Sequence, residues 1–155
     1  MIIRSRRLSV NPERQFKFIL VEDELFAQII VRHIVESAKH FLDVVGSAER
    51  ALALFQENQY DLIFLDLGLP VMSGLELCKK LRVEMNLTTP IVAVTAFDAM
   101  SKENECIKNG FSDFIEKPLD DDKFKKIVDK FLMPSSVYVI GDRLLVGDAD
   151  EKVGS

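Results

Sequence analysis

Several apolar runs in the sequence stop abruptly at polar side chains that could do chemistry together. One run is followed by Glu22 and Asp23, and others lead to Asp66, Thr95 and Lys117. A short, continuous apolar run is typical of a strand that is buried on both faces of a parallel sheet. Because such sheets bind their ligands at the carboxyl ends of the strands, we expect these side chains to meet at one edge.

The expected cluster has a specific chemical use. Clustered carboxylates repel one another, and burial raises their pKa values further. A hard cation such as Mg²⁺ resolves this repulsion, because it prefers oxygen ligands. With the cation bound, Asp66 could stay ionised and act as a nucleophile toward a phosphoryl donor. The Lys117 ammonium would then neutralise phosphoryl charge, and the Thr95 hydroxyl would donate a hydrogen bond to a phosphoryl oxygen.

The elements that must position these residues follow from hydrophobic periodicity. Short apolar runs, expected to be strands, cover residues 18–21, 42–45, 62–65, 91–94 and 114–115, and a helical pattern follows each of them. This alternation predicts an α/β fold with a doubly wound, five-stranded parallel sheet and five helices that cover both faces. The first helix has its apolar residues at helical spacing: Leu25, Phe26, Ile29, Ile30 and Ile34.

Local signals indicate where several helices begin and end. Ser47 and Ser101 are expected to cap helices, and Gly110 is suited to the position just after a helix. The acidic run at residues 120–122 is interpreted as the first turn of the last helix, where acids favour the helix dipole. Glu24 is likewise interpreted as the start of the first helix rather than as a metal ligand.

The sequence divides into three parts. Residues 16–132 form the expected domain, and residues 133–155 form a tail in which two apolar runs flank Gly141-Asp142 and suggest a β-hairpin. That hairpin could extend a sheet edge, dock on the domain or pair with another chain, and disorder is an equal alternative for residues 147–155. Residues 1–15 form a basic arm that could touch an acidic partner, although a frayed terminus is the simpler interpretation.

Composition narrows the class of protein. The chain has 155 residues, 48% of them hydrophobic, and a net charge of −5, so we expect one domain and no direct binding to nucleic acid. Cys78 and Cys106 have neither disulfide nor metal spacing and are expected in the core, which favours a reduced, cytoplasmic chain. No apolar run approaches the ~18 residues of a membrane span. His33 and His40 are interpreted as ordinary structural histidines.

The motifs resemble the receiver domain of two-component response regulators. The resemblance extends over most of the domain, and its motifs occur in order at residues 19–24 (ILVEDE), 61–70 (DLIFLDLGLP), 73–74 (SG), 90–96 (PIVAVTA) and 110–119 (GFSDFIEKPL). It implies a flavodoxin-like fold with the strand order 2-1-3-4-5.

The resemblance also implies the metal site and the phosphoacceptor. Asp66 would accept the phosphoryl group. Asp23 and Asp66 would supply carboxylates to Mg²⁺, and the Gly68 backbone carbonyl would be a further ligand. Glu22 would complete the acidic site by holding a metal-bound water.

Three further residues receive roles from the resemblance. Thr95 and Lys117 would contact the phosphoryl group, and the Lys117-Pro118 bond is usually cis in the family. Thr95 and Phe114 would form the switch, with Phe114 turning into the space that Thr95 vacates. This movement would change the face formed by the fourth helix, the fifth strand and the fifth helix.

The implied function is that of a phosphoaccepting receiver in a phosphorelay. A histidine kinase or a histidine phosphotransfer protein would phosphorylate Asp66, and a downstream protein would bind the altered face. The chain would be a signalling module that promotes its own phosphorylation and dephosphorylation, not an enzyme. Gly68 offers no side chain to help attacking water and Phe97 is bulky, so we expect slow self-dephosphorylation.

Alternatives remain at this point. The chain could be a stand-alone regulator or a receiver from a hybrid kinase, and it could form a homodimer. A pseudo-receiver, which would bind partners without phosphorylation, is the alternative function. A phosphohydrolase is disfavoured, because it would need an acid/base carboxylate where Gly68 stands. In the simplest structural interpretation, Asp66 is a strand-terminal acid and Lys117 is its salt-bridge partner.

Overall fold

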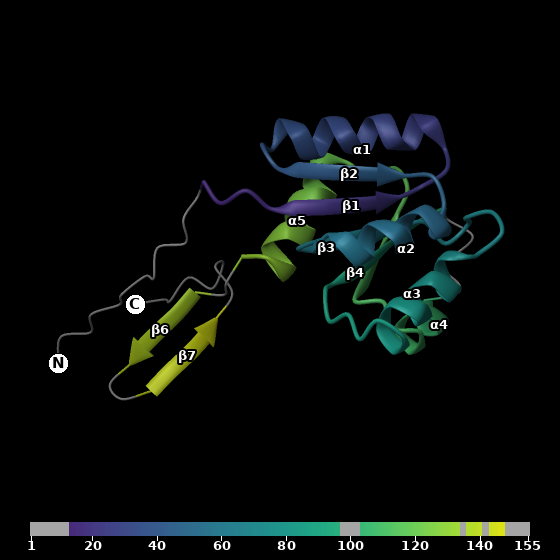
Figure 1. Ribbon diagram of the computed structural model, residues 1–155. Helices are drawn as coiled ribbons and strands as arrows, with labels where there is room; N and C mark the ends of the chain where they lie inside the picture. The colour runs from purple at the N-terminus through teal and green to yellow at the C-terminus, as the bar shows by residue number, and fades with distance from the viewer. Residues whose placement is uncertain (1–12, 97–102, 134–135, 141–142, 148–155) are drawn as a thin grey trace.

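The computed structural model describes residues 13–96, 103–133, 136–140 and 143–147, the last two segments as backbone only (Figure 1). The strands are β1 (Lys17–Val21), β2 (Phe41–Val45), β3 (Leu62–Leu65), β4 (Ile91–Thr95), β5 (Asp113–Glu116), β6 (Ser136–Ile140) and β7 (Arg143–Gly147). The helices are α1 (Leu25–Ser37), α2 (Ala48–Glu57), α3 (Gly74–Val83), α4 (Glu103–Lys108) and α5 (Asp121–Phe131).

Five of the strands form one parallel sheet. Their order is β2-β1-β3-β4-β5. The strand order therefore reverses at β1, which has β2 on one side and β3 on the other. Val21 of β1 pairs with Val45 of β2 on one side and with Leu65 of β3 on the other. This register places the residues that follow β1 and β3 next to each other at the carboxyl edge of the sheet. The expected fold and strand order are confirmed.

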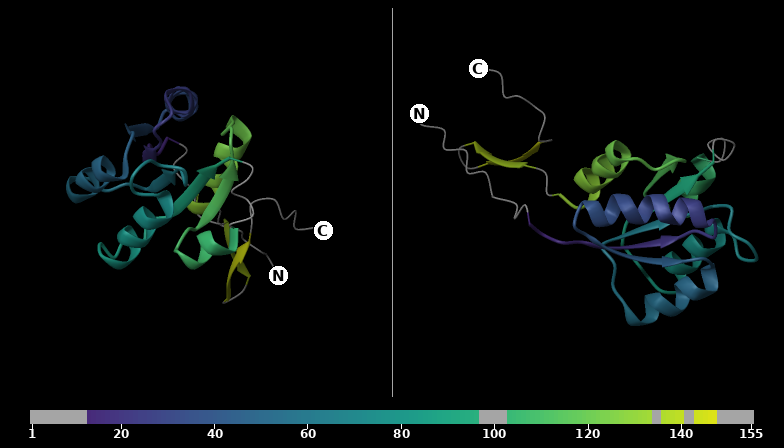
Figure 2. Two further views of the ribbon diagram at one scale, coloured as in Figure 1. Left: turned by 90° about the vertical axis from the view of Figure 1, so that its right-hand side faces the viewer. Right: turned by 90° about the horizontal axis from the view of Figure 1, so that it is seen from above.

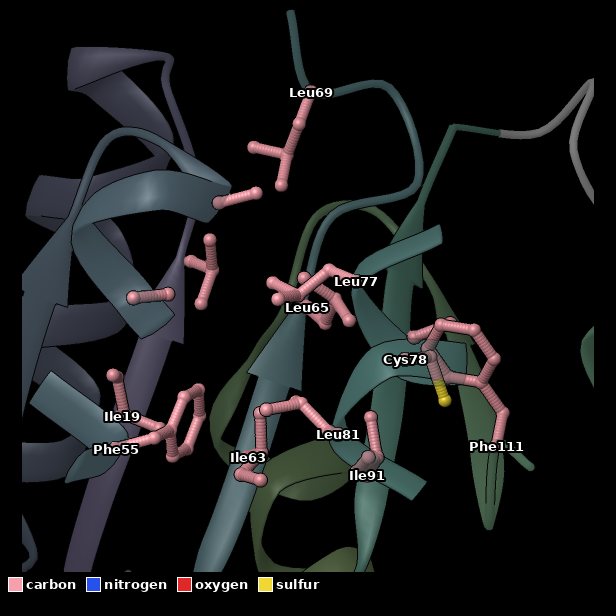
Figure 3. Close-up of a cluster of buried hydrophobic side chains, with 14 of the residues drawn as sticks. Ile19, Phe55, Ile63, Leu65, Leu69, Leu77, Cys78, Leu81, Ile91 and Phe111 are labelled. Atoms are coloured by element: carbon pink, nitrogen blue, oxygen red, sulfur yellow. The ribbon is translucent and has the colours of Figure 1, made fainter. Parts of the chain in front are cut away.

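Two hydrophobic layers hold helices against the two faces of the sheet. One layer includes Ile19, Ile63 and Ile91 from the sheet and packs against α2, α3 and α4 (Figure 3). The other includes Phe18 and Phe64 and packs against α1 and α5. Figure 2 shows the helices on the two sides of the sheet. Alternate residues of each central strand enter opposite layers, which explains the continuous apolar runs at residues 18–21, 62–65 and 91–94.

The helix boundaries follow the expected capping residues. The Ser47 hydroxyl accepts a hydrogen bond from the Arg50 amide, and an Asp120 carboxylate oxygen accepts one from the Lys123 amide. Glu24 is the N-cap of α1 and accepts from Ala27, as expected from its interpretation as a helix start. The expected cap Ser101 lies outside the described residues.

The first helix corrects one expectation. Leu25, Phe26 and Ile29 are 69%, 67% and 56% exposed, so they do not form the buried stripe. Ile34, which is also in the expected set, is buried, and so are Val31 and Val35. Apolar residues cover more than one face of this helix, and periodicity alone therefore could not identify the face that contacts the sheet.

The tail contains a two-stranded antiparallel sheet. Among the described residues, β6 and β7 pair only with each other, with Ile140 opposite Arg143. Gly141 and Asp142, the expected turn, lie outside the described part. Figure 1 shows this pair apart from the carboxyl edge of the larger sheet. None of the helices that the structure describes is long and apolar enough to cross a membrane.

Candidate functional site

Three carboxylates meet at the carboxyl edge of the sheet. The Asp66 amide donates to the Val21 carbonyl over 3.0 Å, and this bond aligns the end of β3 with the end of β1. One carboxylate oxygen from each of Glu22, Asp23 and Asp66 lies within 4.8 Å of the others. Glu22 and Asp66 are buried, whereas Asp23 is exposed. The structure thus brings together the three acidic residues that the strand ends predicted.

Lys117 supplies the positive charge in this cluster. Its Nζ atom lies 2.7 Å from Glu22 Oε2 and 3.4 Å from Asp66 Oδ2. Burial acts to lower the pKa of Lys117, but the neighbouring Glu22 and Asp66 carboxylates raise it overall, so the ammonium stays charged. Burial raises the pKa of Glu22, and the Asp66 charge adds to this effect while Lys117 opposes it. One ammonium therefore serves two buried carboxyl groups.

Thr95 and Phe114 occupy neighbouring strands beside the acids. Thr95 is buried at the end of β4, and its backbone carbonyl accepts the Lys117 amide over 2.7 Å. Phe114 lies in β5 opposite Ala93 and packs, half-buried, against the layer of Figure 3. The two residues thus lie on adjacent strands, and their role as a switch stays a prediction. Phe97, the expected shield of the site, lies outside the described residues.

The loop after β3 contributes backbone to the site. The Gly68 amide donates to Asp66 Oδ1 over 3.0 Å, so one carboxylate oxygen is already fixed by the backbone. This contact was not predicted, because sequence patterns do not reveal the direction of a loop amide. The Lys117-Pro118 peptide bond is cis.

The donor set suits a small hard cation. Glu22, Asp23 and Asp66 offer carboxylate oxygens, and the described residues contain no histidine or cysteine in this group. Mg²⁺ is typically bound by one or two carboxylates and several waters, and exposed Asp23 leaves one side of the group open to solvent. The residues therefore fit Mg²⁺, with the Gly68 carbonyl as a candidate further ligand.

Comparison with known proteins identifies the family. The chain matches the model of the response regulator receiver domain over residues 18–129. The chain belongs to this family. Among the relatives of this receiver, the aerobic respiration control sensor protein ArcB of Escherichia coli (strain K12) is 32% identical over 122 residues, which make up 77% of this chain and 16% of ArcB. The two-component response regulator ORR41 of Oryza sativa subsp. japonica is 34% identical over 123 residues, which make up 76% of this chain and 95% of ORR41.

Solved structures agree with the family and the fold. The chemotaxis response regulator CheY4 of Vibrio cholerae superposes on this receiver with a TM-score of 0.70 and 26% sequence identity, covering 77% of this chain and all of CheY4. The receiver spans a small part of ArcB but nearly the whole of ORR41. Its relatives are therefore both domains of larger sensor proteins and single response regulators.

Proposed function

We propose that this receiver accepts a phosphoryl group on Asp66 from a histidine kinase or a histidine phosphotransfer protein. The observation that carries the proposal is the position of the buried Asp66 carboxylate, beside Glu22 and Asp23 and 3.4 Å from the Lys117 ammonium. The Gly68 amide holds one Asp66 oxygen, which leaves the other oxygen, on the Lys117 side, as the nucleophile. A carboxylate with this orientation suits in-line attack on phosphorus.

The transfer balances without a further reagent. An Asp66 oxygen forms a bond to phosphorus, the bond between phosphorus and the donor imidazole nitrogen breaks, and the electron pair stays on that nitrogen. Mg²⁺, when bound by the acidic residues, supplies positive charge next to the phosphoryl oxygens. Lys117 contacts a phosphoryl oxygen after exchanging part of its contact with Asp66. The Thr95 hydroxyl donates to another phosphoryl oxygen.

The phosphorylated state would differ from the described one at the β4–β5 side of the sheet. Phosphorylation adds negative charge and acceptor oxygens next to Thr95. We expect Thr95 to move toward the phosphoryl group and Phe114 to turn inward. Phosphorylation would shift the population from the first conformation toward the second. In the second conformation, the face formed by α4, β5 and α5 would bind a downstream protein. In this role the chain is a signalling module rather than a turnover enzyme.

An exposed apolar surface beside the acids is suited to the phosphodonor. Leu25, Phe26 and Ile29 lie in the first turns of α1, which begins two residues after Asp23, and each is more than half exposed. A donor must approach this edge to bring its phosphohistidine to Asp66, so it covers the start of α1. Apolar contacts there would supply affinity without a charge on the donor. Cys78 and Cys106 are buried and form no disulfide in the described part of the chain, which agrees with an exchange in the reducing cytoplasm.

The proposal is tested by incubating the chain with Mg²⁺ and acetyl phosphate and measuring its intact mass. Wild type should gain one phosphoryl group, and Asp66→Asn should gain none. Asp129→Asn is the matched control, because Asp129 is an exposed acid on α5 whose side chain makes no hydrogen bond or ion pair among the described residues. If the wild type gains no phosphoryl group from acetyl phosphate or from a phosphorylated histidine donor, a pseudo-receiver replaces the proposal.

A further inference from the structure

Lys123, in the first turn of α5, is hydrogen-bonded to the backbone on both sides of Lys117. Lys123 Nζ donates to the Glu116 carbonyl over 3.0 Å and to the Pro118 carbonyl over 3.0 Å. These two carbonyls flank the residue whose side chain reaches Glu22 and Asp66. The Lys123 ammonium, which lies outside the acidic cluster, thus bridges the backbone segment that carries the Lys117 ammonium into the cluster.

Lys123 is itself fixed at its backbone. Its amide donates to Asp120 Oδ1 over 2.8 Å, as the N-cap bond of α5. The next residue, Phe124, is buried in the layer between α5 and the sheet. Lys123 therefore extends from an anchored helix start, and the residue is half-buried.

The two acceptors distinguish Lys123 from an ordinary surface lysine. The described part of the chain shows no carboxylate within ion-pair distance of Lys123, so its charge is directed at two carbonyl oxygens. Hydrogen bonds from a charged donor are stronger than neutral ones. The remaining backbone bond of this segment joins the Lys117 amide to the Thr95 carbonyl. Without Lys123, residues 116–118 would lose two of the hydrogen bonds that fix the backbone around Lys117.

We propose that Lys123 is a positioning residue for phosphoryl transfer, which holds residues 116–118 so that Lys117 Nζ reaches the Asp66 oxygen. This inference rests on the proposed function of Asp66. It also connects the site to α5: a partner that displaces the first turn of α5 would loosen Lys117, and phosphorylation would in turn change the affinity for that partner.

The test compares three substitutions in the full chain. Lys123→Met keeps the length of the side chain and removes its donors, Lys123→Arg keeps several donors, and Lys126→Met is the control on the same helix. Lys126 is exposed, and its side chain makes no hydrogen bond or ion pair in the described part of the chain. Each variant is phosphorylated with acetyl phosphate over a range of donor concentrations, with urea unfolding measured in parallel.

Lys123→Met should lower the maximal phosphorylation rate about tenfold. A catalytic group that is misplaced by 1 Å can lower a rate roughly a hundredfold, and we expect the displacement of Lys117 to be smaller than 1 Å. The half-saturating donor concentration should stay the same, and Lys123→Arg should restore most of the rate. Lys126→Met should match wild type. A normal maximal rate in Lys123→Met would overturn the inference, as would a rate that falls only in proportion to lost folded protein.

A second readout separates this inference from the proposed function. Hydrogen exchange of the Lys117 amide reports the bond to the Thr95 carbonyl and needs no phosphorylation. Exchange at Lys117 should be faster in Lys123→Met than in Lys126→Met. If wild type is never phosphorylated, the proposed function fails, and unchanged exchange would then overturn the holding role of Lys123 as well.

Discussion

Asp66 and its neighbours are arranged so that charge and burial oppose each other. Glu22 is 1% exposed and Asp66 is 7% exposed, yet both lie within 3.4 Å of the same ammonium. Two buried carboxylates with one counterion leave a surplus of negative charge, which attracts a cation to the exposed side at Asp23. The same surplus keeps Lys117 charged, so the group that would bind the phosphoryl oxygens is ready before phosphorylation.

His40 gives a prediction that depends on pH. Its Nδ1 atom accepts the Phe16 amide over 3.1 Å, and its ring lies against Phe16, Phe18 and Phe124. Burial lowers the pKa of His40 below its ordinary value of 6.5, although Asp61 acts in the opposite direction. The folded state therefore binds fewer protons than the unfolded state, and the free energy of unfolding must fall as pH drops from above 6.5 through the lowered pKa.

The measurement is urea unfolding of wild type and His40→Asn between neutral and mildly acidic pH. Asparagine keeps an acceptor for the Phe16 amide but does not titrate. Above pH 6.5 the difference in the free energy of unfolding should be constant, and below it the wild type should lose its advantage. Parallel pH profiles for the two proteins would show that His40 titrates normally.

Val71 is held in an unfavourable backbone conformation. Its φ is 66° and it is 96% exposed, so a β-branched residue adopts a left-handed conformation without any burial in return. Val71→Gly should raise the free energy of unfolding by about 0.5–1 kcal/mol, because relief of the strain exceeds the added entropy of the unfolded chain. Asn86→Gly, at φ 53°, is the control and should have less effect, since asparagine tolerates this region. A lower free energy of unfolding for Val71→Gly than for wild type, measured with urea, would contradict the prediction.

The next scale is that of the elements, where α3 begins in direct contact with the end of β3. The Gly74 amide donates to the Leu67 carbonyl, and a Cβ at Gly74 would overlap the Asp66 carbonyl oxygen. Gly74→Ala should therefore lower the free energy of unfolding by about 2 kcal/mol or more and displace Asp66. Gly68→Ala is the matched control, because its Cβ would meet Asp66 Oδ1 at an ordinary 3.7 Å. Equal urea midpoints for the two variants would contradict this packing.

Arg82 connects α3 to the segments that lead into β4 and β5. Its guanidinium donates to the carbonyls of Leu87, Thr89 and Gly110 over 2.7–2.9 Å and to the Ser112 hydroxyl over 3.3 Å. Burial lowers the pKa of Arg82. The acceptors of these bonds are all neutral oxygens, so no carboxylate pairs with the guanidinium in them. Arg82→Met should lower the free energy of unfolding by about 2–3 kcal/mol, because several partly buried carbonyls lose a charged donor.

The control for Arg82 lies two residues earlier on the same helix. Lys80 pairs with Glu84 over 3.3 Å at the surface, and exposed pairs of this kind contribute only about 0.3–0.5 kcal/mol. Lys80→Met should therefore have a much smaller effect on the urea midpoint than Arg82→Met. Similar effects of the two substitutions would mean that Arg82 acts as a surface charge and not as a connection between elements.

At the scale of the whole molecule, the sheet could be predicted because its central strands share one requirement, which is burial on both faces. Strands such as β3 are buried on both faces, and this burial requires the continuous apolar run at residues 62–65. The acids and Lys117 could be predicted for the same reason, since polar residues at the ends of such runs can point only to the edge of the sheet. Parallel pairing then brings Glu22 next to Asp66 without any further information.

Contacts that depend on the relative rotation and tilt of helices could not be predicted. The exposed Leu25 and Phe26 have the same apolar character as the buried Val31, so composition does not show which side of α1 meets the sheet. The bonds of Lys123 and Arg82 end on backbone carbonyls, which every residue carries and no sequence pattern marks. These long side chains link segments far apart in the chain, and only the folded arrangement reveals their acceptors.

The most direct test of the central claim is to locate the phosphoryl group chemically. Wild type is phosphorylated with acetyl phosphate and Mg²⁺, reduced with borohydride, which converts an aspartyl phosphate to homoserine, and sequenced by tandem mass spectrometry. The site geometry predicts homoserine at position 66 and at no other acid. Homoserine at position 23, or a phosphoryl group that resists reduction and maps to His33 or His40, would contradict the assignment of Asp66 as the phosphoacceptor.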